Sequence, residues 1–172
     1  MTIYSPKRCC DERPCCCESA VRSVIPVPPV APLGIFADYY ALAPTDNATA
    51  IAAGEAVDFP RGSASDYFAI SRIDDSTFNL AKPGAYLVMF NVGTDTPGQL
   101  ELTLNGSPLS YTVAGADAAD SQINGLAVVT TTLPNSTLSV INPAGNTSEV
   151  TVTQNSGGSA PSSSHLIIVK LA

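Results

Sequence analysis

Short apolar stretches separated by turn residues limit the folds that this chain can adopt. From residue 34 onward, segments of high β-propensity alternate with Gly, Pro, Asn and Asp, and no long segment has the 3.6-residue apolar period of a helix. The pattern predicts an all-β domain, an antiparallel β-sandwich or jelly roll, and disfavours a parallel α/β fold. The expected strands span residues 36–42, 56–59, 67–73, 77–80, 85–92, 99–104, 109–113, 126–133, 137–142, 149–153 and 165–171.

For two of these expected strands, the sequence also predicts which side chains are buried. The segment 85–92 is almost continuously apolar and follows the turn signal at residues 82–84, so we expect burial on both of its faces. In the segment 99–104, Leu100, Leu102 and Leu104 alternate with other residues and should share one face. The following Asn-Gly pair at 105–106 is a favoured hairpin dipeptide, and it predicts a tight turn there.

Composition changes abruptly near Leu33 and divides the chain into two predicted parts. Residues 1–33 form a cysteine- and proline-rich connector arm, and residues 34–172 form the head domain. The prolines between residues 26 and 32 favour an extended polyproline II spacer, because each proline ring fixes φ. The chain is long enough for one domain with a core plus this appendage.

All five cysteines lie in the arm: Cys9, Cys10, Cys15, Cys16 and Cys17. An odd number cannot all pair within one chain, and adjacent cysteines rarely bridge each other because their Cα atoms are only about 3.8 Å apart. Covalent cross-linking between subunits is the preferred interpretation. A zinc site is an alternative, although the spacing lacks two separated C-x₂₋₄-C pairs and no histidine is near. Acylation and reduced thiols also stay open.

The apolar residues of the arm are candidate anchors on a neighbouring subunit. An extended arm could add along a sheet edge or fill a groove, using main-chain hydrogen bonds and apolar side chains. The alternative is that these residues pack on their own head. The candidate anchors are Ile3, Tyr4, Val21, Val24 and Ile25.

Charge and hydropathy exclude several partners. The net charge of −7 argues against a nucleic acid or an anionic membrane, because neither attracts an acidic surface. No apolar run approaches the roughly 20 residues that cross a bilayer. The first residues also lack the apolar region of a secretory signal, so we expect no classical export.

Groups that could support catalysis are sparse. The one histidine, His165, has no nominated nucleophile or orienting partner in the sequence, and we expect a structural or surface role for it. Phosphate-binding glycine loops and an H-E-x-x-H helix are also missing from the sequence. We therefore predict a protein that is not an enzyme and needs no cofactor.

Two other residue types suggest sites that common structural roles also explain. Carboxylates at Asp74, Asp75, Asp117 and Asp120 could bind calcium, but loop carboxylates are usually just solvated. Four N-x-[ST] sequons occur, and we interpret their asparagines as turn residues, with glycosylation left open. These asparagines are Asn47, Asn105, Asn135 and Asn146.

The head resembles the C-terminal domain of the BclA-like exosporium glycoproteins of spore-forming bacteria. The resemblance rests on residues 36–42, 53–59, 78–88, 102–106 and 164–171. It implies a jelly roll like that of tumour necrosis factor (TNF) and complement C1q, assembled as a homotrimer. Unlike a BclA-like protein, this chain has no Gly-X-Y collagen stalk before the head.

The arm resembles the N-terminal connectors of endospore appendage subunits, through its two cysteine clusters. That resemblance implies trimeric heads stacked head to tail through the arm into a disulfide-linked fibre on the spore surface. Spore-surface proteins are released when the mother cell lyses, which is compatible with the absence of a signal peptide. We expect the partners to be other copies of the chain and an exosporium or spore-coat anchor protein. The alternative is an exosporium-anchored adhesin or lectin-like binding knob.

Overall fold

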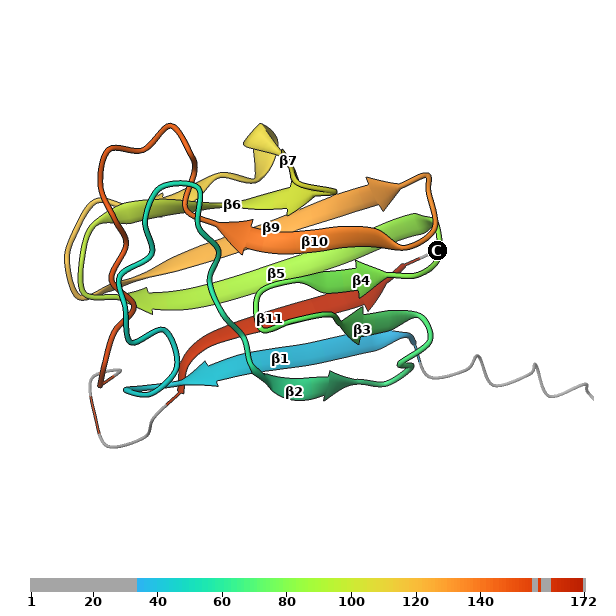
Figure 1. Cartoon of the computed structure of the whole chain (residues 1–172), viewed down its shortest axis with the longest axis horizontal. Helices are drawn as coiled ribbons and strands as arrows, with labels where there is room; N and C mark the ends of the chain where they lie inside the picture. The colour runs from blue at the N-terminus through green and yellow to red at the C-terminus, as the bar shows by residue number, and fades with distance from the viewer. Residues whose placement is uncertain (1–33, 156–157, 159–161, 172) are drawn as a thin grey trace, which may run out of the picture. The chain divides into compact units, whose positions relative to one another are not determined.

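The head consists of two antiparallel sheets, and the computed structural model describes residues 34–155, 158 and 162–171 of the chain (Figure 1). One short 3₁₀ helix, η1, accompanies the strands. The elements are β1 (Phe36–Leu42), β2 (Arg61–Ala64), β3 (Ile70–Arg72), β4 (Phe78–Leu80), β5 (Gly84–Thr94), β6 (Gly98–Leu104), β7 (Ser107–Pro108), η1 (Ser110–Thr112), β8 (Ala114–Ala116), β9 (Ser121–Thr131), β10 (Ser136–Ile141) and β11 (Ser162–Lys170).

The strand order is that of a jelly roll, which confirms the predicted fold class. The five-stranded sheet has the order β2-β1-β11-β5-β9, and the six-stranded sheet has the order β3-β4-β10-β6-β7, with β8 paired to β6. Strands distant in sequence are therefore neighbours. In the five-stranded sheet, β11 lies between β1 and β5 and pairs antiparallel with both.

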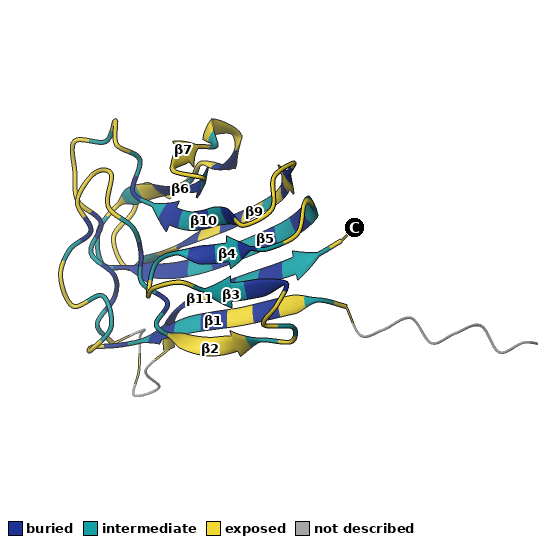
Figure 2. Ribbon diagram, turned by 45° about the vertical axis from the view of Figure 1, so that its right-hand side comes forward, coloured by how far each residue is buried: buried dark blue, intermediate teal, exposed yellow. Residues whose placement is uncertain are grey.

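The core lies between the two sheets and is built from alternating strand positions. Along β1, buried residues alternate with more exposed ones, as the stripes in Figure 2 show. The ring of Phe78 contacts those of Tyr39, at a centroid distance of 4.6 Å, and Phe59, at 6.3 Å. Leu100 and Leu102 are fully buried and Leu104 packs against the same core, so their predicted common face is confirmed.

The first and last described strands bring the two ends of the head together. Phe36 of β1 lies opposite Val169 of β11, and the Lys170 N–H donates to the Ile35 carbonyl at 2.8 Å. The chain therefore enters the head at residue 34 and leaves it at residue 171 at the same end of the sandwich (Figure 1).

Asparagines serve as turn residues, as the sequence predicts. Asn105 and Gly106 have φ values of 52° and 75° and close the β6–β7 hairpin. Asn47 and Asn135 also adopt left-handed φ values, 54° and 55°, and the Asn146 N–H closes a turn to the Pro143 carbonyl at 2.9 Å. This conformation favours asparagine among residues other than glycine, because its short side chain bonds locally.

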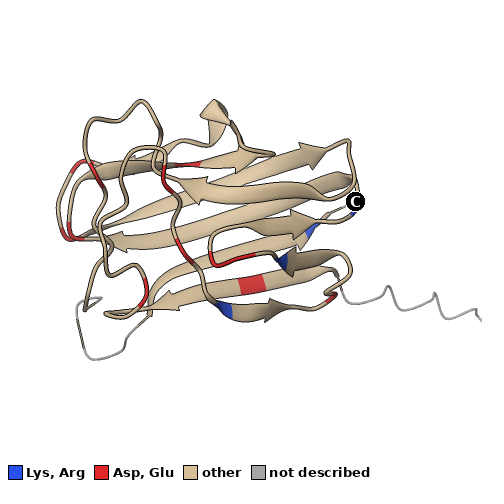
Figure 3. Cartoon of the chain, in the orientation of Figure 1, with Lys and Arg blue, Asp and Glu red and all other residues tan. Residues whose placement is uncertain are grey.

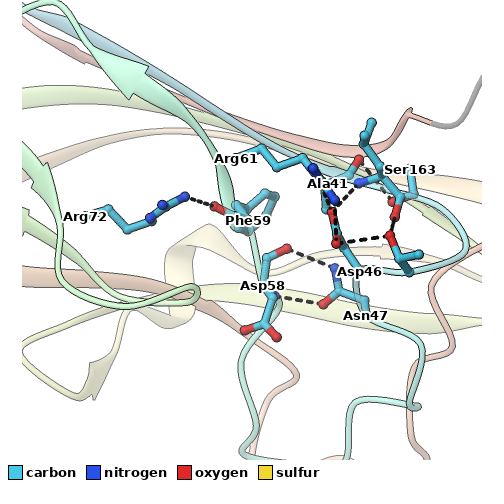
Figure 4. Close-up of polar contacts among 10 residues, drawn as sticks. Ala41, Asp46, Asn47, Asp58, Phe59, Arg61, Arg72 and Ser163 are labelled. Carbon is cyan, nitrogen blue, oxygen red and sulfur yellow. Dashed lines mark hydrogen bonds and ion pairs between the residues drawn. The ribbon is translucent and has the colours of Figure 1, made fainter.

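The Asn47 side chain also braces the loop before β2. It donates to the carbonyl of Asp58 at 2.9 Å and accepts from the Asp58 N–H at 2.8 Å (Figure 4). Nearby, the Arg72 guanidinium donates to the Phe59 carbonyl at 3.4 Å. The side chains of Asn47 and Arg72, from two different segments, therefore hold residues 58–59, which belong to no regular strand.

Three predicted strands are wrong. In place of the strand predicted over 109–113, Ser110–Thr112 form η1, where the Thr112 hydroxyl accepts from the Leu102 N–H at 2.8 Å and donates to the Leu109 carbonyl at 2.7 Å. Residues 56–59 and 149–153 make only isolated bridges. The latter segment pairs first with Ile51 and then with Thr94, so no continuous ladder forms.

One strand that the sequence pattern does not indicate is β2, a polar edge strand with mostly exposed residues. Arg61 at its start donates from Nε to Asp46 Oδ2 at 2.7 Å (Figure 4). This hydrogen bond holds the pKa of Asp46 below its usual range. A local ion pair, rather than an apolar pattern, therefore secures this edge.

Candidate functional site

The face of the five-stranded sheet that turns away from the core carries exposed apolar side chains. The β5–β9 register sets Met89 opposite Leu126 and Leu87 opposite Val128. Leu126 is 70% exposed and Val128 48%, and both belong to β9, a long regular strand at the edge of the sheet. Exposed apolar patches of this kind mark interaction sites.

The patch continues across the sheet onto β11 and β1. Ile167 lies opposite Met89, and Val169 is paired with both Leu87 and Phe36. A hollow of about 240 Å³ opens between Met89, Leu126 and Ile167. We call this surface the apolar face; it comprises Phe36, Leu87, Met89, Leu126, Val128, Ile167 and Val169.

The predicted burial of β5 on both faces is wrong for the single chain. The core-facing residues Tyr86, Val88 and Val92 are fully buried, whereas Leu87 and Met89 between them are only partly buried. Leu126 and Val128, their partners on β9, are well exposed, so this second side is open to solvent in the single chain. A single head therefore buries only one of the two apolar sides of β5 completely.

Charge is low on β5 and β9, whereas Asp38 of β1 lies opposite Ile167 and brings a carboxylate to the edge of the apolar face. Neither β5 nor β9 contains Asp, Glu, Lys or Arg, and the acidic residues of the head lie mainly in loops (Figure 3). Depletion of charged residues is the compositional mark of the core of a protein interface. The two central features of an association surface, apolar exposure and low charge, therefore coincide on these strands.

A polar row borders the apolar face. The registers align Tyr40, His165, Asn91 and Asn124 across β1, β11, β5 and β9. Tyr40 and His165 stack with ring centroids 5.8 Å apart, and the Asn91 amide donates to Asn124 Oδ1 and to Gln122 Oε1. The apolar face thus ends sharply at a row of hydrogen-bonding groups.

His165 lies on the surface, as predicted, with neighbours that the sequence does not nominate. Its Nε2 lies 2.9 Å from Ser162 Oγ, and its Nδ1 lies 3.6 Å from Asp38 Oδ1. The side chains of His165 and Asp38 are 47% and 57% exposed. A separation of 3.6 Å is too long for a hydrogen bond, so the carboxylate does not orient the imidazole as a catalytic triad requires.

The predicted cross-linking cysteines and connector anchors, all between residues 3 and 25, lie outside the described residues. Their roles, and the boundary between the arm and the head at residue 33, stay predictions. In the described part of the chain, no helix is long and apolar enough to cross a membrane.

The sequence offers the acidic loops as possible calcium sites, and in the structure Asp74 has a local role instead. Asp74 Oδ1 accepts from the Ser76 N–H at 3.0 Å and from the Ser76 hydroxyl at 3.2 Å, which makes it a turn residue. Across residues 34–155 and 162–171, no three His, Cys, Asp or Glu side chains gather closely enough to hold a metal ion.

Comparison with known proteins identifies the fold. The globular domain of zebrafish complement 1qA superimposes with a TM-score of 0.50 and 16% identity, over 80% of this chain and 94% of that one. Murine APRIL at pH 8.0 gives a TM-score of 0.54 and 12% identity, over 80% and 98% of the two chains. The head is therefore a TNF/C1q-like jelly roll, as predicted. No protein-family model and no curated protein sequence matches the chain.

Proposed function

We propose that the protein is a structural subunit of a spore-surface or endospore-appendage fibre. Three heads associate through the apolar face, and the N-terminal arm joins each trimer to the next through intermolecular disulfides. The observation that carries the proposal is the exposed apolar face, whose most exposed aliphatic side chains, Leu126 and Val128, lie on a strand without charged residues. The role is non-catalytic.

Burial of the apolar face supplies the driving force for association. Full burial of one Val, Leu or Phe side chain is worth about 1.5–3 kcal/mol relative to leaving it in water. Leu126, Val128 and Phe36 are each at least 45% exposed in the single chain. Several such side chains covered together can offset part of the cost of bringing the heads into contact.

A second copy is the partner that best accounts for the pattern of β5. Its near-continuous apolar sequence is typical of a strand covered on both sides, yet one head covers a single side. Copies arranged around an axis would cover the other side in every subunit at once, because rotational symmetry repeats the same contact. The BclA-like resemblance of the head implies three copies.

The arm supplies the link between trimers. Its five cysteines cannot all pair within one chain, so at least one thiol is available for a neighbour. A contact between different surfaces of successive trimers does not close on itself and generates a filament. Disulfides then make the filament resistant to heat and denaturant. An exosporium or spore-coat protein is the proposed anchor at its base.

Negative-stain electron microscopy of the full chain, beside a variant lacking residues 1–17, tests the proposal. Filaments from the full chain that shorten in reductant, and isolated heads from the variant, are the expected result. A matched variant with serine at all five cysteine positions separates the thiols from the rest of the arm. Single particles from the unreduced full chain would refute the fibre.

A further inference from the structure

A second hollow, of about 460 Å³, opens at the end of the five-stranded sheet where β5 ends and β9 and β11 begin. Its volume is within the range of about 300–1,000 Å³ that is usual for small-molecule sites. Every described lining residue is polar or glycine. The residues used below are Asn91, Thr94, Asp120, Gln122, Ser164 and His165.

The lining chemistry narrows the class of ligand. An apolar molecule would bury no carbon against aliphatic or aromatic side chains, because the described lining has none apart from the His165 ring. An anion would meet the Asp120 carboxylate, with no Lys or Arg among these residues to neutralise it. Amide and hydroxyl groups, which both donate and accept, match the adjacent hydroxyls of a neutral sugar.

Two lining residues point independently to an incomplete polar site. Thr94 Oγ1 and Ser164 Oγ are buried and have no hydrogen-bond partner in the described structure. Buried hydroxyls without a partner are rare in native proteins and call for an explanation. Both residues line the hollow, so its described lining contains hydrogen-bonding capacity that the chain itself does not use.

Two polar residues of the lining lie at the start of β9. Gln122 Oε1 accepts from Asn91 Nδ2 at 3.1 Å, so the Gln122 amide nitrogen is the group of this side chain that can donate to a ligand. Asp120, two residues earlier, is exposed and adopts a left-handed φ of 52°. An amide donor and a two-oxygen acceptor therefore belong to the lining of the same hollow.

We propose that this hollow binds a neutral saccharide, with Asp120 accepting from sugar hydroxyls and Gln122 donating to one. The inference goes beyond the structural role and adds a lectin-like function to the head. It does not rest on the proposed trimer, because every group named belongs to one chain. The hollow shares Asn91 and His165 with the polar row that ends the apolar face, which is where the rim of a subunit contact would fall.

Saturation-transfer-difference NMR on the full chain tests this site. The probes are glucose, galactose, mannose, rhamnose and N-acetylglucosamine, with N-acetylneuraminic acid as the anionic member. We expect a signal from at least one neutral sugar and none from the anionic one. Asp120→Asn retains a residue that tolerates the left-handed conformation, and Gln122→Ala removes the donor. Each should weaken binding about tenfold, the size expected for losing one hydrogen bond to or from the ligand.

Gln99→Ala is the matched control, because Gln99 is an exposed glutamine on β6 of the other sheet. It should bind the sugar as the unmodified chain does. Equal melting temperatures confirm that the variants are folded. The site is refuted if no sugar gives a signal, if the anionic sugar binds best, or if both hollow variants bind like the control. These outcomes leave the fibre untouched, since electron microscopy reports on it separately.

Discussion

Gly125 of β9 lies against the ring of Phe90 on the neighbouring strand β5. A Cβ atom on Gly125 would fall 2.1 Å from Phe90 Cε1, far inside contact distance. Phe90 is only 3% exposed, so displacing its ring would disturb the side chains packed around it. We predict that Gly125→Ala lowers the free energy of unfolding by about 1–3 kcal/mol, as overpacking does in other cores.

Chemical denaturation measures this effect, and Gly145→Ala is its control. Gly145 has no heavy atom within 4 Å of the position of an added Cβ. A second variant, Gly125→Ala with Phe90→Leu, should recover part of the lost stability because the smaller side chain yields space. Equal stability of Gly125→Ala and Gly145→Ala would contradict the steric argument.

The side chain of Thr112 takes the place of a backbone carbonyl as the hydrogen-bond acceptor for a strand of the six-stranded sheet. Its buried hydroxyl accepts from the Leu102 N–H and donates to the Leu109 carbonyl. Thr112→Val keeps the shape but leaves the Leu102 N–H unpaired, so we predict a loss of about 1–3 kcal/mol in the free energy of unfolding. Thr130→Val, at an exposed position of β9, should change it by much less. Denaturant titration of both variants checks the difference.

Asp58 makes the stability of the head depend on pH. Burial raises the pKa of its carboxyl, and the charges of Asp75, Asp74 and Asp46 raise it further. The folded protein therefore binds this proton more tightly than the unfolded chain, whose aspartates titrate near pH ~3.9. The sign follows: this group costs stability as the pH rises through its folded pKa.

We therefore predict that Asp58→Asn melts at a higher temperature than the unmodified chain at pH 7, and at the same temperature at pH 3. Thermal melting at both values measures the effect. Asp117→Asn removes an equal charge from an exposed position and should not show this pH-dependent gain. An Asp58→Asn variant that is destabilised equally at both pH values would show that ionisation of the Asp58 carboxyl does not lower the stability of the head.

Leu126 is the most exposed aliphatic residue of the apolar face, so it tests association most directly. In reductant, which removes any disulfide contribution, light scattering should give three chain masses for the unmodified protein. Leu126→Lys should give a lower mass, because a buried unpaired charge is costly. Phe68→Lys, at an 87% exposed loop position off this face, should leave three chain masses. Three chains from Leu126→Lys would exclude the apolar face as the contact.

Regular strands with clear alternation could be predicted from sequence. Residues 36–42 match β1 at both ends, and 137–142 matches β10 to within one residue at each end. Residues 109–113 alternate as a strand does, yet a side-chain hydroxyl takes over the backbone pairing there. An alternating sequence pattern cannot reveal this competition between a side chain and the backbone, because the competition depends on a partner strand several residues away.

The two surfaces proposed as functional, the apolar face and the polar hollow, could not be predicted from the sequence. A period of two identifies the faces of a strand but does not say which face one chain covers, so the exposure of Leu87 and Met89 required the structure. The hollow proposed to bind a sugar takes its described lining from four stretches, within residues 91–94, 120–122, 153–155 and 162–165. These stretches are distant in sequence, and only the jelly-roll topology brings them together.

The pairing of β1 with β11 also determines how the head bears mechanical load. A pull between residue 34 and the opposite end of the sandwich runs along β1, so its hydrogen bonds with β11 and β2 resist together in shear. A pull between residues 34 and 171, which lie at the same end, would open the β1–β11 pairing one bond at a time. A fibre that carries tension through the arm and the far end of each head would therefore load this domain in its stronger direction.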